Sequence, residues 1–152
     1  MIILKSIFYG IFSAIGATIF QTVVVIILGV KTIDTNHLTS ILIYFALLEE
    51  LFKFIFIYKL GTETQNFKEI ISGSLLIGLG FSLVELTFKT LENSENLLYL
   101  DYLGIILIHV LTAGIIGIFI AQKWNTYIKI ILGIGTAFIL HIIYNSLQIY
   151  IF

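Results

Sequence analysis

Residues 45–56 read FALLEELFKFIF and carry Glu49, Glu50 and Lys53 within an otherwise apolar run. The run extends over about 38–60. A helix rises 1.5 Å per residue, so about 20 residues suffice to cross the hydrocarbon core of a bilayer. Ionisable side chains are rare at that depth and by default indicate a functional site. The segment therefore predicts a transmembrane helix that carries reactive or ion-handling groups.

The rest of the chain has the composition of an integral membrane protein. Of its 152 residues, 59% are hydrophobic and 11% are charged, and none is proline. Polar spacers, too short to form a soluble domain, separate five apolar runs, at about 6–30, 38–60, 69–91, 100–121 and 127–152. We therefore expect a single all-α domain over 1–152, a polytopic membrane protein built as a bundle of about five transmembrane helices.

The lysines predict the orientation, because cytoplasmic loops carry an excess of positive charge. One side of the membrane would carry Lys5, Lys59, Lys68, Lys123 and Lys129, and the other Lys31 and Lys89. We expect a multi-pass protein of the cell membrane with its N-terminus in the cytoplasm and its C-terminus outside. The first run has no A-x-A-like cleavage site after its roughly 25 apolar residues, so we expect a retained helix.

Charge and cysteine content exclude several classes of function. A formal net charge of −1 gives no electrostatic basis for binding nucleic acid. The chain has no cysteine, which rules out disulfides, iron–sulfur clusters and thiolate metal sites.

Polar groups also interrupt the later apolar runs. Glu85 lies in the third run, His109 in the fourth, and His141 and Asn145 in the fifth. Counted from the ends of helices that alternate in direction, Glu49, His109 and His141 fall near mid-membrane, and Glu85 lies closer to the outer face. We therefore expect these side chains to share one layer of the bundle.

Small residues at helical spacing predict which helix faces pack together, because they let membrane helices approach closely. The stripes are Ser74, Gly78, Ser82 and Glu85; His109, Ala113 and Gly117; and Gly133, Ala137, His141 and Asn145. The first run has only the packing part of this pattern, in Gly10, Ala14, Thr18 and Gln21. We expect this helix to be a scaffold.

The charges in the predicted layer do not balance. Three carboxylates face one ammonium, and each uncompensated ion costs several kcal/mol in a low dielectric. Protons on carboxylates, charged histidines or a bound divalent cation would offset them. His109, His141 and Glu85 would supply the His₂Glu ligands of a hydrolytic zinc site, although the chain has no H-E-x-x-H spacing. Zinc is thus one of three alternatives that the residues leave open.

Four motifs resemble, in order and placement, those of the PrsW family of intramembrane proteases: Glu49-Glu50-x-x-Lys53, Phe81-x-x-x-Glu85, the lone His109, and His141-x-x-x-Asn145. That family is related to the CAAX-protease and bacteriocin-processing (CPBP/Abi) families, whose motifs look like E-E-x-x-x-R, F-x-x-x-H and H-x-x-x-N. Lys53 and Glu85 point to the PrsW branch. The resemblance covers about 45–148. Leu86 stands where PrsW-type sequences commonly show Asn, and family members usually have more helices.

The resemblance implies an intramembrane endopeptidase that acts on a transmembrane or membrane-bound peptide or protein. Glu49 or Glu50 would take a proton from water, with Lys53 fixing the geometry. His141 would bind a metal or donate to the oxyanion, and Asn145 would donate a second hydrogen bond. The candidate catalytic residues are Glu49, Glu50, Lys53, Glu85, His109, His141 and Asn145, and the candidate metal ligands are Glu85, His109 and His141.

Other functions also suit these residues. A non-catalytic, immunity-type relative would keep the fold, and a proton- or cation-handling membrane protein would use the same buried groups. A haem protein with His109 and His141 as axial ligands and a purely structural bundle are further alternatives. A homo-oligomer, which would complete the substrate groove of so small a chain, is open as well.

Overall fold

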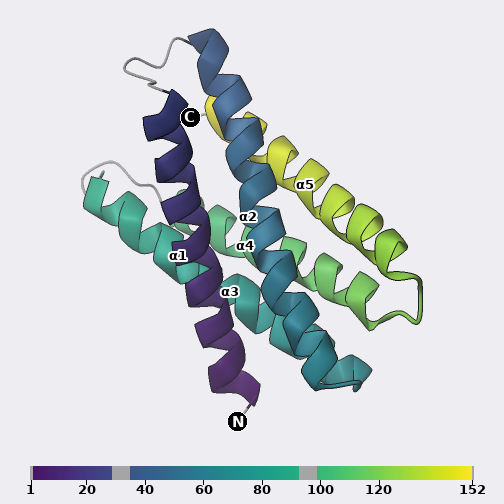
Figure 1. Ribbon diagram of the computed structural model, residues 1–152. Coiled ribbons are helices and arrows are strands. Elements are labelled where there is room, and N and C mark those ends of the chain that lie inside the picture. Colours follow the sequence, from purple (N-terminus) through teal and green to yellow (C-terminus); the bar gives the residue numbers. More distant parts are fainter. Residues whose placement is uncertain (1, 29–34, 93–98, 152) are drawn as a thin grey trace.

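The computed structural model describes residues 2–28, 35–92 and 99–151, and it is all-helical (Figure 1). The helices are α1 (Ile2–Leu28), α2 (Thr35–Glu63), α3 (Phe67–Glu92), α4 (Tyr99–Ala121) and α5 (Thr126–Ile151). They coincide with the five predicted runs to within a few residues, which confirms the all-α fold. Lys31, on which the predicted orientation partly rests, and the predicted helix ends at 29–30 and 152 lie outside the described residues.

Four helices, α1, α3, α4 and α5, are long and apolar enough to cross a membrane, as judged by length and composition. The protein is therefore a membrane protein with at least these candidate spans. Helix α2 is not among them; it carries Glu49, Glu50, Lys53 and Lys59 in its middle and second half. That α2 is a fifth transmembrane helix stays a prediction.

Helix α2 packs against each of the other four helices. Helix α3 packs between α1 and α4, and α4 packs between α3 and α5. The helices α1, α3, α4 and α5 therefore form a row, and α2 packs across it (Figure 1). Among the described residues, α3 and α5 make no contact with each other. The polar residues of α2 thus face groups from several helices, and the space between α3 and α5 is not closed by direct packing.

Glycine allows the closest helix approach in the bundle. A Cβ atom on Gly10 of α1 would collide with the backbone oxygen of Ile77, and one on Gly80 of α3 with the backbone oxygen of Ile7. Gly78 approaches α4 in the same way, against the backbone of His109. The predicted stripes therefore do face the interior, as expected for helices that associate through small residues.

A polar cluster ties α1 to α2 at the end of the bundle where α1 begins. Lys5 Nζ lies 2.7 Å from Glu63 Oε2, and the Tyr9 hydroxyl donates to Glu63 Oε1 at 2.9 Å. The ammonium groups of Lys5 and Lys59 lie 5.5 and 5.2 Å from the centre of the Tyr9 ring, within range of a cation–π interaction. This cluster joins the two helices far from the Glu49 layer.

Candidate active site

Side chains from α2, α4 and α5 converge near the middle of their helices. Glu49, His109 and His141 each offer a ligand atom, and these atoms all lie within 4.8 Å of one another. His109 and His141 are buried, and their rings stand nearly perpendicular with centroids 5.3 Å apart. The layer expected from counting along the helices therefore exists in the folded chain.

Glu50 joins α2 to α5 inside this layer. Its Oε1 atom lies 2.6 Å from Lys53 Nζ and 2.6 Å from His141 Nδ1, and its side chain is fully buried. The ionised carboxylate can only accept, so His141 donates its Nδ1 proton, and in the neutral ring Nε2 then carries a lone pair. Glu50 Oε2 is buried without a hydrogen-bond partner among the described residues.

Lys53 is buried one turn from Glu50 and contacts α4 as well. Its Nζ atom lies 2.9 Å from Thr112 Oγ1 and 3.1 Å from His109 Nδ1, and it stands 4.9 Å from the centre of the Phe81 ring. Thr112 is not among the residues that the sequence predicts for the site. Its position three residues after His109, on the same face of a helix, is the signal that could have identified it.

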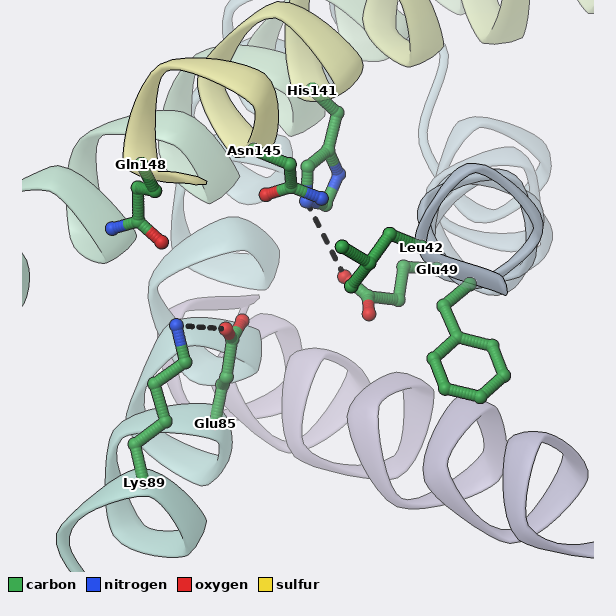
Figure 2. Close-up of a pocket in the computed structure, with 8 residues that line it drawn as sticks. Leu42, Glu49, Glu85, Lys89, His141, Asn145 and Gln148 are labelled. Carbon is green, nitrogen blue, oxygen red and sulfur yellow. Dashed lines mark ion pairs between the residues drawn. The ribbon is translucent and has the colours of Figure 1, made fainter. Parts of the chain in front are cut away.

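Glu85 is held between two basic side chains. Its Oε2 atom contacts His109 Nε2, and Lys89 Nζ lies 3.4 Å from its Oε1 atom (Figure 2). Both carboxylate oxygens therefore have a partner, on α4 and one turn further along α3.

Glu49 differs from Glu50 in its surroundings. Its Oε2 atom lies 3.6 Å from His141 Nε2, and its Oε1 atom accepts a hydrogen bond from Gln21 Nε2 at 3.0 Å. Gln21 also donates to the backbone oxygen of Phe45, at 3.4 Å. Helix α1 is thus more than the expected scaffold, because it contributes a polar contact to the site. The amide that ends its stripe of small residues is the sequence signal for this contact.

A cavity of about 290 Å³ lies beside Glu49, and we call it the α2–α3–α5 pocket (Figure 2). Its lining residues are Leu42, Phe45, Glu49, Glu85, Lys89, His141, Asn145 and Gln148. From Glu49 and His141, these residues run toward the end of the bundle where α2 begins and α3 and α5 end. In Figure 2, Asn145 and Gln148 of α5 face Glu85 and Lys89 of α3 across the pocket.

The exposure of the lining side chains shows which way the pocket opens. The exposed fraction rises from 5% for His141 to 18% for Glu49, 28% for Glu85 and 35% for Lys89. The pocket therefore begins at the buried histidine and opens toward Lys89. Leu86, which stands where an Asn is common in PrsW-type sequences, does not line the pocket.

The comparison with protein families covers nearly the whole chain. The family model described as PrsW family intramembrane metalloprotease matches residues 1–151. The chain belongs to the PrsW family. The match includes α1, which the four sequence motifs leave out, and it supports a membrane-embedded protease. No curated protein and no solved structure matches the chain.

Two side chains of this PrsW-family chain, Glu49 and His141, are placed to act as ligands of one divalent metal ion. Glu49 Oε2 and His141 Nε2 face each other at 3.6 Å, and both are acceptors when Glu49 is ionised and His141 is neutral. Glu50 accepts from the other ring nitrogen of His141, which is how carboxylates orient metal-ligating histidines. The third residue within 4.8 Å is His109. The predicted ligand set has Glu85 in place of Glu49, and a metal-binding role for Glu85 stays a prediction.

Proposed function

We propose that this PrsW-family chain is an endopeptidase in which Glu49 activates a water molecule at the closed end of the α2–α3–α5 pocket. The observation that carries the proposal is the 3.6 Å separation of Glu49 Oε2 and His141 Nε2 beside the pocket. Two acceptors at this distance require a hydrogen donor or a cation between them, and a water molecule donates to both. Its oxygen lone pair is then directed at a bound peptide group.

The choice of Glu49 over Glu50 rests on access. A general base must reach the water within hydrogen-bond distance, directly or through one more water. Glu49 lines the pocket, whereas Glu50 is fully buried and its Oε1 atom is shared by Lys53 and His141. Glu50 and Lys53 are therefore positioning residues in this proposal, and Glu49 is the base.

The reaction uses the remaining polar groups of the pocket. Glu49 takes a proton from water as the water oxygen attacks the carbonyl carbon. Asn145 lines the pocket and makes no hydrogen bond with another described residue, so its amide is free to donate to the developing oxyanion. Glu49 then passes its proton to the leaving amine as the C–N bond breaks. The resulting carboxylic acid passes its remaining proton to the amine, and the carboxylate and ammonium products leave by the open end of the pocket.

If a metal takes part, Glu49 and His141 would hold it, with Glu49 then acting as a ligand instead of the base, and zinc is the ion we propose. The bound ion would supply Lewis acidity at the carbonyl oxygen. Glu50 would keep His141 in the ligating orientation, as it does for the water.

The substrate we propose is a transmembrane or membrane-bound peptide or protein. The pocket opens toward one end of the bundle, and α3 and α5 are not packed together there. A substrate segment would enter between these helices. Its helical hydrogen bonds must open first, because a membrane helix shields its own peptide groups. We therefore propose cleavage near the end of a substrate helix, in the half of the membrane that contains Lys89, and we leave open a homo-oligomer that widens the groove.

Comparison of peptide ends in cell membranes tests the proposal and does not require that the substrate be identified first. Membrane proteins from cells that make the wild-type chain are compared by mass spectrometry with those from cells that make Glu49→Gln. Glu69→Gln, at an acidic residue outside the pocket, is the matched control. We expect new peptide ends, in or beside transmembrane helices, in the wild type and the control only. Identical ends in all three would favour an immunity-type relative or an ion-handling protein.

A further inference from the structure

We propose that Lys53 and Thr112 are positioning residues that hold His109 with its proton on Nε2, so that His109 donates a hydrogen bond to Glu85 instead of binding water or metal. The two histidines of the site then have different tasks. The link to catalysis rests on the proposed function, but the protonation pattern rests on the contacts of Lys53, Thr112 and Glu50.

Lys53 has one close partner for each of its three ammonium protons. An ammonium group has three hydrogen atoms and no acceptor. Its three close partners are Glu50 Oε1 at 2.6 Å, Thr112 Oγ1 at 2.9 Å and His109 Nδ1 at 3.1 Å. The lysine side chain is fully buried, so water does not compete for these protons. Each partner therefore accepts one of them.

Thr112 is suited to the role of acceptor. Its hydroxyl donates to the backbone oxygen of His109, at 3.3 Å, one turn earlier in α4. This contact uses the single hydroxyl proton and turns the oxygen lone pairs toward Lys53. The hydroxyl thus fixes where the ammonium lies relative to the ring of His109.

The state of the His109 ring follows from these contacts. Its Nδ1 atom accepts from Lys53, so in the neutral ring the proton is on Nε2. A doubly protonated ring would direct an N–H group at the ammonium, which like charge disfavours. The Nε2 atom contacts Glu85 Oε2, an acceptor, and a protonated nitrogen has no lone pair for a metal. His109 is therefore a donor that orients Glu85.

His141 has the opposite tautomer. It donates its Nδ1 proton to Glu50 Oε1, the same atom that accepts from Lys53. Its Nε2 lone pair faces Glu49 Oε2. One buried carboxylate and one buried ammonium thus set both rings, and only His141 is left with a free lone pair.

Side-chain nitrogen NMR of histidine-labelled protein in detergent tests this assignment directly. The chain has three histidines, which His37→Gln, His109→Gln and His141→Gln variants assign. We expect the proton of His109 on Nε2 and that of His141 on Nδ1. In Thr112→Val and in Lys53→Met, His109 should shift toward a mixture of tautomers, and Lys68→Met, at a lysine outside the site, is the control that should not change it. A wild-type His109 with its proton on Nδ1 would overturn the proposal even if Thr112→Val and Lys53→Met do not fold.

Cobalt(II) binding is a second test of the different roles of His109 and His141, and it does not require protease activity. We expect the visible absorption of bound cobalt(II) to be lost in His141→Gln and retained in His109→Gln. Equal loss in both variants would overturn the division of tasks. Neither measurement depends on substrate cleavage, and the tautomer assignment does not require a metal either, so it remains decisive if the peptide-end comparison contradicts the proposed protease function.

Discussion

His141 Nδ1 lies 2.6 Å from Glu50 Oε1, a contact between residues that are 91 positions apart in the sequence. The same oxygen lies 2.6 Å from Lys53 Nζ, so the carboxylate joins α2 and α5 around a buried ion pair. Glu49 is the preceding residue in the chain, yet it faces the pocket and takes no part in that pair. Adjacent glutamates thus have different tasks, one in holding the site together and one in the reaction that we propose.

The difference between the two glutamates predicts a difference in stability. Glu50→Ala leaves Lys53 buried without its charge partner, which typically costs about 3–5 kcal/mol. Glu49→Gln keeps the size of a partly exposed side chain and should leave the unfolding temperature close to that of the wild type. Thermal unfolding in detergent, followed by circular dichroism, measures both. Equal destabilisation by the two substitutions would contradict the assignment.

Gln21 is expected to affect catalysis from α1, a helix that holds none of the predicted site residues. Gln21→Leu removes the hydrogen bond to Glu49, and bonds to charged groups contribute about 1.5–3 kcal/mol. We expect the rate of cleavage, measured as the yield of new peptide ends per folded protein, to fall about 10-fold or more.

Thr22→Val is the control for Gln21, because the Thr22 hydroxyl donates only to the backbone oxygen of Thr18 among the described residues. This substitution on the next residue should leave the cleavage rate unchanged. If the two variants behave alike, the contact between α1 and Glu49 has no catalytic role.

Replacing glycine by alanine is expected to have opposite effects at Gly80, where α3 crosses α1, and at Gly135 of α5. Gly80→Ala puts a methyl group against the backbone of Ile7, and such overpacking costs about 1–3 kcal/mol or more. Gly135→Ala meets no atom within 4 Å and should be neutral or stabilising by up to about 1 kcal/mol, because alanine favours helix. Unfolding temperatures in detergent compare the two, and a stable Gly80→Ala variant would argue against the close crossing.

Thiol labelling tests both the direction in which the pocket opens and the predicted orientation. The chain has no cysteine, so Lys89→Cys carries a single thiol at the open end of the pocket. A water-soluble maleimide added to intact cells should label it, because we predict that this end faces outward. Ala113→Cys, at a fully buried position, should stay unlabelled, and Lys59→Cys should react only after the membrane is permeabilised. Labelling of Lys59→Cys alone in intact cells would reverse the predicted orientation.

The sequence by itself determined the helices, their inward stripes and the depth of the polar groups. These features are local: hydropathy and length define a helix such as Phe67–Glu92, and a constant rise per residue sets the level of Glu49 against that of His141. The order of the four motifs was also sufficient to indicate the PrsW family.

Only the tertiary structure decided how the polar residues are paired. Glu49 and Glu50 are neighbours in sequence but point about 100° apart around a helix. Which of them meets the pocket and which meets Lys53 and His141 depends on where α1, α4 and α5 pack against α2. Gln21 and Thr112 enter the site for the same reason, since a hydrogen bond requires two groups about 3 Å apart and that distance is set by packing across the bundle.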